Sequence, residues 1–201
     1  MKNHESKLQF KKAEAPLPTK YGNFIIRIYK ENSGIENIAL IKNLNPDEPV
    51  LVRVHSSCHT GDIFGSFRCD CGPQLEHALQ LIENNGSGVL LYLNQEGRGI
   101  GLFNKIKAYA LQDEGLDTVE ANERLGFAPD ARDYHVAAAM LEEMNISQVE
   151  LLTNNPNKEK QLAEYGITVA KRIPLEIPPN KFDKKYLETK KVKLHHKLTV
   201  V

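Results

Sequence analysis

The chain has 201 residues, of which 41% are hydrophobic and 26% charged, and its 26 basic residues balance its 26 acidic ones. This length and composition are those of a globular protein with a substantial core, built as one large domain or two small ones. The zero net charge disfavours a surface that coats nucleic acid, and no apolar run approaches the roughly 20 residues of a membrane span.

The N-terminal part of the chain is predicted to be rich in strands. Residues 1–16 are polar and lysine-rich, carry a proline and are expected to form a flexible arm. Short apolar or alternating runs then predict strands over residues 24–29, 38–41 and 49–55. The first twenty residues lack the apolar centre of a secretory signal, so we expect a cytoplasmic protein.

Helices and strands alternate from residue 73 onward. Helices are predicted over residues 73–85, 103–115, 134–145 and 156–165, and strands over residues 89–93, 148–152 and 167–173. This order predicts a mixed α/β (α+β) fold with a β-rich N-terminal part. One domain is expected over residues 17–175, followed by a lysine-rich extended or helical tail over residues 176–201, with a last helix around 183–196.

All the cysteines of the chain lie at one place. Cys58, Cys69 and Cys71 fall within fourteen residues, with the spacing C-x10-C-x-C. An odd number of clustered thiols in a reducing compartment indicates a metal site or thiol chemistry rather than disulfides. On an extended segment, Cys69 and Cys71 would point to the same side. Three thiolates leave one corner of a zinc tetrahedron open, as in catalytic zinc sites.

The residues alone leave other interpretations of the cysteines open. The three thiols can be incidental, or one of them can be a nucleophile that needs no metal. A structural zinc site would require a fourth protein ligand, for which the neighbouring candidates are His55, His59 and Asp70. The fourth position therefore distinguishes a catalytic from a structural site.

Two junctions between a predicted strand and a predicted helix have features of anion sites. The loop EGRGIGL, residues 96–102, carries Arg98 among glycines but lacks the third glycine of dinucleotide-binding loops. The segment LLTNNPNK, residues 151–158, offers Thr153, an asparagine cap, a proline at the first helical position and Lys158. A tight turn and ordinary capping are the alternatives, but a lysine at the positive end of a helix favours contact with a phosphate.

Two polar segments carry further candidates. APDARDYH, residues 128–135, places Asp130 and Arg132 two residues apart, a spacing that by itself favours a solvated helix start. DTVEAN, residues 117–122, offers Thr118 and Glu120. A carboxylate there can pair with the donor-rich edge of a base or lie on an exposed turn.

Together these segments resemble GTP cyclohydrolase II, the family of enzymes that begins riboflavin synthesis from GTP. The resemblance covers about residues 15–190 and rests on RVHSSCHTGDIFGSFRCDCGPQL, QEGRGIGLFNKIKAYALQDEGLDTVEAN, LGFAPDARDY and LLTNNPNK. It implies that residues 17–175 are the catalytic domain of a monofunctional form, without the synthase domain of bifunctional relatives. It also implies a homodimer, one Zn²⁺ per subunit and Mg²⁺ bound with the triphosphate.

The resemblance implies a role for particular residues. Zinc would be held by Cys58, Cys69 and Cys71; Asp130 would accept a proton, Arg132 would attack the α-phosphate, and Tyr109 would belong to the ring-opening site. GTP contacts are implied for Arg53, Val54, His55, Ser56, Ser57, Gln74, Glu96, Gly97, Arg98, Thr118, Thr153 and Lys158, to which we add Glu120 from its position near Thr118. Since a guanidinium stays protonated, Arg132 is equally suited to be an electrostatic clamp held by Asp130.

The resemblance also implies a chemistry and leaves rivals to it. A zinc-bound hydroxide would open the imidazole ring of guanine and release formate, while cleavage of the triphosphate would release pyrophosphate. Family members often carry Glu at position 57 and an apolar residue at position 59, so Ser57 and His59 are departures. These departures motivate one rival, a paralogue with altered product or base preference. A zinc-stabilised nucleotide-binding regulator without turnover is the other.

Overall fold

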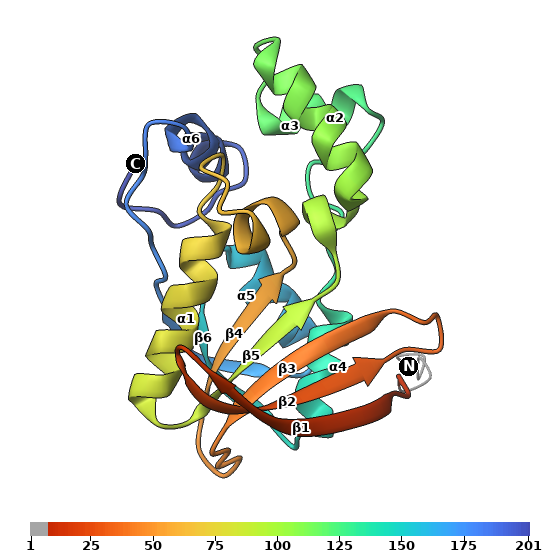
Figure 1. The fold of residues 1–201 in the computed structure, drawn as a ribbon, viewed down its shortest axis with the longest axis vertical. Helices are drawn as coiled ribbons and strands as arrows, with labels where there is room; N and C mark the ends of the chain where they lie inside the picture. The colour runs from red at the N-terminus through yellow and green to blue at the C-terminus, as the bar shows by residue number, and fades with distance from the viewer. Residues whose placement is uncertain (1–7) are drawn as a thin grey trace.

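Residues 8–201, which the computed structural model describes, form a seven-stranded mixed sheet in the order β1-β2-β3-β5-β4-β6-β7 (Figure 1). The strands are β1 Lys11–Thr19, β2 Gly22–Lys30, β3 Glu36–Lys42, β4 Val50–Ser56, β5 Gly88–Leu93, β6 Gln148–Leu152 and β7 Thr168–Ile173. Neighbours from β1 to β5 in this order run antiparallel, and those from β5 to β7 run parallel. The predicted mixed α/β class with a β-rich start is confirmed.

Helices cover both faces of the sheet. They are α1 Cys71–Asn85, α2 Gly101–Asp113, α3 Thr118–Arg124, α4 His135–Glu143, α5 Pro156–Glu164 and α6 Lys184–Val192. Successive residues of β5 point to opposite faces, so Leu90 joins the core under α1 while Val89 and Leu91 join the core under α4 and α5. Within residues 8–201, no helix is both long and apolar enough to cross a membrane.

The parallel half of the sheet positions the functional segments. Because β4, β5 and β6 run in the same direction, their carboxyl ends meet at one edge, and the loops that follow them lie together there. Figure 1 shows α2 and α3 on one side above this edge and α6 on the other. The loops after the three strands carry the cysteine, glycine-rich and asparagine-proline motifs respectively.

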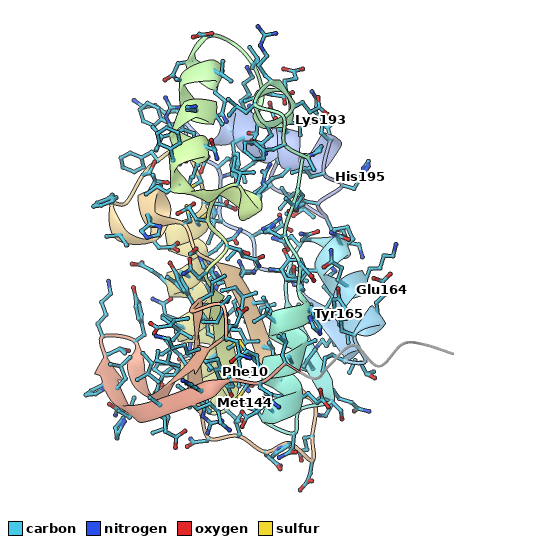
Figure 2. The ribbon with its side chains drawn as sticks, turned by 90° about the vertical axis from the view of Figure 1, so that its right-hand side faces the viewer. Phe10, Met144, Glu164, Tyr165, Lys193 and His195 are labelled. Carbon is cyan, nitrogen blue, oxygen red and sulfur yellow. The ribbon has the colours of Figure 1, made fainter. Side chains whose placement is uncertain are left out.

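The prediction of a flexible N-terminal arm is wrong for residues 11–16. These residues belong to β1, which pairs antiparallel with β2 along its whole length, from Lys11 opposite Lys30 to Thr19 opposite Gly22. The prolines of this segment are compatible with a strand because β1 lies at the edge of the sheet. Phe10, before β1, packs edge-to-face on Tyr29 with ring centroids 5.2 Å apart, against the core that includes Met144 (Figure 2). Residues 1–7 of the predicted arm lie outside the described residues.

Candidate active site

A pocket opens at the carboxyl edge of the parallel strands. It encloses about 1060 Å³, including its open mouth, and is lined by the loops after β4, β5 and β6 together with residues of α2 and α6. All residues predicted for the site line this pocket except Val54, Asp130 and Glu120. Segments separated by more than a hundred residues in the chain therefore meet at one place.

The three cysteines converge in the wall of the pocket. The sulfurs of Cys58 and Cys69 are 3.7 Å apart, and all three sulfurs lie within 4.8 Å of one another. A tetrahedral zinc ion with Zn–S bonds of 2.3 Å holds its sulfurs about 3.8 Å apart. Gly61 packs directly on the cluster, since a Cβ added there would lie 2.9 Å from the sulfur of Cys69. The number, chemistry and spacing of the donors fit zinc.

The local backbone that brings the thiols together differs from the extended segment we expected for residues 69–71. Cys71 is the first residue of α1, and Asp70 before it is the N-cap, with φ −91° and ψ 9°. The chain thus bends between Cys69 and Cys71, and this bend makes their sulfurs converge. Cys58 comes from the end of β4, where a single π-helical turn, His59–Ile63, places Gly61 against the sulfurs.

The three residues considered as a fourth ligand are bonded elsewhere. The Nε2 atom of His55 lies 3.1 Å from the Asp62 carboxylate, and the Nδ1 atom of His59 lies 2.7 Å from Glu96 Oε2. Asp70 accepts hydrogen bonds from Lys190 and Gln74. The donor group at this place in the described chain consists of the three thiols, an arrangement that favours a fourth position left to water or substrate.

Lys105 connects the thiols to the glycine-rich loop. Its Nζ atom donates to the sulfur of Cys58 at 3.0 Å and to Glu96 Oε1 at 2.9 Å. Although burial lowers the pKa of Lys105, the Cys58 and Glu96 charges raise it well above its usual range. Glu96 also accepts from the backbone N–H groups of Gly97 and His59, at 2.7 and 2.6 Å. The carboxylate predicted to contact GTP is therefore fully engaged within the protein, and His59 is one of its partners.

A buried histidine and carboxylate lie beside the thiol loop. Asp62 accepts from the backbone N–H of Cys58 and the hydroxyl of Tyr92, both at 2.9 Å. Burial lowers the pKa of His55 despite the nearby Asp62, so the imidazole is neutral at pH 7, with its Nε2–H directed at Asp62. The Nδ1 atom of His55 is then an acceptor, and it has no hydrogen-bond partner within residues 8–201.

A second group of residues that line the pocket is cationic. Both terminal nitrogens of Arg98 are buried and have no hydrogen-bond partner in the described part of the chain. Lys158 is 4% exposed and donates to the carbonyl oxygen of Val54 at 2.5 Å. Burial, together with the charges of Arg53 and Arg132, lowers the pKa of Lys158 well below its usual value. This concentration of positive charge is suited to an anionic ligand.

Asp130 and Arg132 form a bidentate pair rather than the solvated helix start that their spacing favours. Arg132 donates from Nε to Oδ1 at 2.8 Å and from Nη2 to Oδ2 at 2.6 Å. Burial raises the pKa of Asp130, but hydrogen bonds and charge from Arg132 outweigh it and hold that pKa below its usual value. Arg132 lines the pocket, whereas Asp130 does not line it and holds the Arg132 guanidinium through these two hydrogen bonds.

Glu120 lies outside the pocket. It is exposed, and its carboxylate accepts from the backbone N–H of Asp117 at 2.9 Å, which closes a capping box at the start of α3. It also pairs with Lys193 at 3.0 Å. Of the two alternatives that the sequence left open for Glu120, contact with a base or an exposed polar position, the structure matches the second.

Several residues in the pocket or beside it were not singled out by the sequence pattern. Asp62 and Lys105 lie in the segments that resemble the family, and Lys105 is one helical turn beyond Gly101, where it faces the glycine-rich loop. Tyr186, Lys190 and His196 come from the tail, whose lysine-rich composition gave no sign of burial. These residues reach the pocket through contacts between distant parts of the chain.

Comparison with known proteins agrees with this site. The family model for GTP cyclohydrolase II matches residues 10–174. The riboflavin biosynthesis protein RibBA of Phocaeicola vulgatus is 54% identical over 190 residues, which cover 94% of this chain and 47% of that protein. The RibBA proteins of Chlorobium phaeovibrioides and Bacillus cytotoxicus are 53% and 52% identical, and the match covers 48% and 51% of their lengths. The chain spans about half the length of the curated relatives it matches. It belongs to the GTP cyclohydrolase II family.

Proposed function

We propose that the chain is a zinc-dependent GTP cyclohydrolase II. It would hydrolyse GTP to 2,5-diamino-6-(5-phosphoribosylamino)pyrimidin-4-one, with release of formate and pyrophosphate, as the first step of riboflavin biosynthesis. The observation that carries this proposal is one pocket lined both by three converging thiols and by unpaired, buried guanidinium nitrogens. The riboflavin biosynthesis proteins among its relatives support the same assignment.

The part of the pocket around the three thiols is suited to the ring-opening step. Cys58, Cys69 and Cys71 would hold zinc, which when bound supplies hydroxide near neutral pH. Tyr109 lines the pocket, and its hydroxyl lies 3.3 Å from that of Thr60. Burial raises the pKa of Tyr109, so the phenol keeps its proton and can donate to charge that develops on the substrate. His55 Nδ1 offers an acceptor in the same pocket.

The cationic residues of the pocket are suited to the triphosphate. The unpaired nitrogens of Arg98 can donate to phosphate oxygens, and bound phosphate would favour the charged form of Lys158. Asp130 fixes both the position and the orientation of Arg132 through its bidentate contact. We assign Arg132 as an electrostatic clamp on the α-phosphate. Mg²⁺ would enter with the triphosphate, bound through phosphate oxygens.

The proposal is tested by product analysis. Purified protein is incubated with GTP, zinc and magnesium, and formate and pyrophosphate are quantified against the GTP consumed. Stoichiometric release of both is expected. Consumption of GTP with another product, or a preference for ATP, would favour the paralogue with altered specificity instead.

The Cys69→Ser variant separates an enzyme from a regulator. The enzyme is expected to stay folded and bind GTP but to release no formate. Unfolding of this variant on metal loss would assign the zinc to the fold and support the regulator. Wild-type protein that binds GTP without turnover would reject the proposed activity outright.

The assembly and compartment follow the family. We propose a homodimer that works in the cytoplasm, where its three free cysteines stay reduced. Light scattering coupled to size-exclusion chromatography tests the dimer, since a monomer mass at micromolar concentration would contradict it.

A further inference from the structure

The C-terminal segment, residues 183–198, reaches into the pocket although it lies beyond residues 10–174, where the family model matches. Tyr186 and Lys190 of α6 and His196 after it line the pocket together with the thiols and the cationic residues. Two of the segment's apolar residues, Leu187 and Leu198, are buried. The segment is therefore packed as a part of the fold and forms one wall of the site.

The C-terminal segment is attached to the other walls of the pocket. Lys193 pairs with Asp117 and Glu120 at the start of α3, and Figure 2 shows it beside that helix. The backbone N–H of Lys197 donates to the carbonyl oxygen of Asn154, in the loop after β6, at 2.9 Å. These contacts fix α6 relative to both the helical and the cationic sides of the pocket.

Lys190 makes the contact with the thiol loop. Its Nζ atom donates to Asp70 Oδ1 at 2.6 Å, and Asp70 lies between two of the cysteines. The other carboxylate oxygen of Asp70 accepts from Gln74 Nε2 at 2.5 Å. The Oε1 atom of Gln74 accepts from Arg53 Nη2 at 2.6 Å. A continuous chain of hydrogen bonds thus runs from α6, past the thiol turn, to the guanidinium of Arg53.

The burial of this network shows that Lys190 is not an ordinary surface lysine. Lys190 is 9% exposed and Asp70 is 2% exposed. A charge this deeply buried is costly unless it is paired, and removal of one partner leaves the other uncompensated. Tyr186 adds its ring face, with the Lys190 ammonium 4.5 Å from the ring centroid. Lys190 is therefore held in one place, and it holds Asp70 in turn.

We propose that residues 183–198 are part of the active site and that Lys190 is a positioning residue. Through Asp70 and Gln74, it fixes both the turn that carries Cys69 and Cys71 and the guanidinium of Arg53. The inference rests on the proposed function for the nature of the ligand, a guanine nucleoside triphosphate. It adds to the site a segment and a residue that lie beyond residues 10–174, where the family model matches.

The test compares substitutions at two adjacent lysines of α6. Lys190→Met removes the charge, Lys190→Arg keeps it, and Lys191→Met is the matched control, since Lys191 is exposed and donates to the carbonyl oxygen of Val201. Three quantities are measured: zinc retention against a chelator, affinity for GTP whose α,β-bridging oxygen is replaced by methylene, and the separate values of kcat and KM for GTP.

Lys190→Met is expected to weaken zinc retention about 10–100-fold, as substitutions of residues that orient metal ligands do. Its affinity for the GTP analogue is expected to fall about tenfold or more, with a matching rise in KM. Lys190→Arg should recover most of both losses, and Lys191→Met should match the wild type. If Lys190→Met does not fold, Lys190→Gln, which can still hydrogen-bond to Asp70 without a charge, takes its place with the same expected direction.

The inference about Lys190 and the proposed function are rejected by different results. If Lys190→Met, or Lys190→Gln in its place, only lowers the thermal unfolding temperature and keeps zinc retention and analogue affinity, α6 has a purely structural role and the inference is rejected. If the wild type makes no formate from GTP, the proposed function is rejected, while zinc retention in the variants still tests the link from Lys190 to the thiol turn.

Discussion

The ammonium group of Lys105 lies 3.0 Å from the sulfur of Cys58, and the same ammonium pairs with Glu96. A lysine from α2 is thereby bonded at once to a proposed metal ligand and to the glycine-rich loop. A hydrogen bond to a thiolate stabilises its charged form and sets its orientation. This contact makes the thiol end of the pocket sensitive to residues that never touch the metal.

Lys105→Met is expected to weaken zinc retention about tenfold or more, because the thiolate of Cys58 loses its N–H donor. The measurement is competition between the protein and a chromogenic chelator. Lys107→Met is the control, since Lys107 is exposed and lies over the ring of Phe103. Equal zinc retention in both variants would show that the Lys105 contact does not influence the metal.

Gly61→Ala is expected to expel the metal by steric conflict. The added Cβ would lie 2.9 Å from the sulfur of Cys69 and 3.0 Å from the Cβ of Cys71, so the thiol loop has to open. Gly65→Ala is the control in the same loop. Gly65 has φ +63° and no neighbour within 4 Å, so its substitution costs stability through backbone strain alone. Zinc content after dialysis distinguishes the two, and metal loss in both variants would point to general disruption of the loop.

Asp130→Asn is expected to lower the free energy of unfolding at pH 7 by about 1.5–3 kcal/mol, through the loss of charge-assisted bonds to Arg132. The folded state holds the pKa of Asp130 below its unfolded value of about 3.9. The stability it contributes is therefore present above that value and is lost as pH falls through the lower folded pKa.

Urea unfolding across pH checks this sign. The gap between wild type and Asp130→Asn should be widest at neutral pH and narrow as pH falls from about 5 towards 3. Asp47→Asn, in an exposed turn, controls for the change of charge. A gap that is constant with pH would show that the carboxylate charge is not the source of the stability.

Polyphosphate binding is expected to take up protons. Burial and the charges of Lys190 and Arg132 lower the pKa of His196 to about 2, and burial with neighbouring cations also lowers that of Lys158. A bound anion raises both pKa values, and Lys158, whose ordinary pKa lies far above neutral pH, is expected to gain a proton. Calorimetry of tripolyphosphate binding in two buffers of different ionisation enthalpy measures the uptake.

The uptake is assigned by comparing variants. Lys158→Met should take up fewer protons than the wild type, whereas His195→Ala should match it, since the exposed His195 points away from the molecule in Figure 2. Identical uptake in wild type and Lys158→Met would show that the buried lysine is already charged in the free protein.

His59→Leu, which places an apolar side chain at this position, is expected to change kcat/KM by less than about fivefold. Its side chain is 43% exposed, and the backbone N–H of residue 59 still bonds to Glu96 after the substitution. Glu96→Gln should have a larger effect, about tenfold or more, because Lys105 then loses its charged partner. Product identification by mass spectrometry accompanies the kinetics. A change of product in His59→Leu would favour the paralogue with altered preference.

Local patterns were enough to predict the elements that position the site. The alternation in residues 49–55 and the apolar run 89–93 identified β4 and β5, and the asparagine and proline before residue 157 identified the start of α5. Because these strands are parallel, their carboxyl ends lie at the same edge of the sheet, and the motifs that follow them lie together there. Segments with strong periodicity or capping chemistry thus carried most of the prediction.

The parts that the sequence did not predict depend on contacts across the chain. β1 is a strand because β2 offers it a complete partner, which the polar residues 11–16 do not reveal. Lys190 looks like its exposed neighbour Lys191, and only the position of Asp70, 120 residues earlier, makes it a buried ion pair. Such pairings are set by tertiary packing and have no signature in local composition.

The proline-bearing strand β1 also has a consequence for how copies of this chain can meet. β1 is the outer strand on its side of the sheet, and Pro16 and Pro18 stand opposite Ile25 and Asn23 of β2. A proline nitrogen carries no hydrogen, so strand addition along this edge would lack donors at alternate positions. Growth of the sheet from one molecule into the next is therefore discouraged here, which protects a long exposed edge against aggregation.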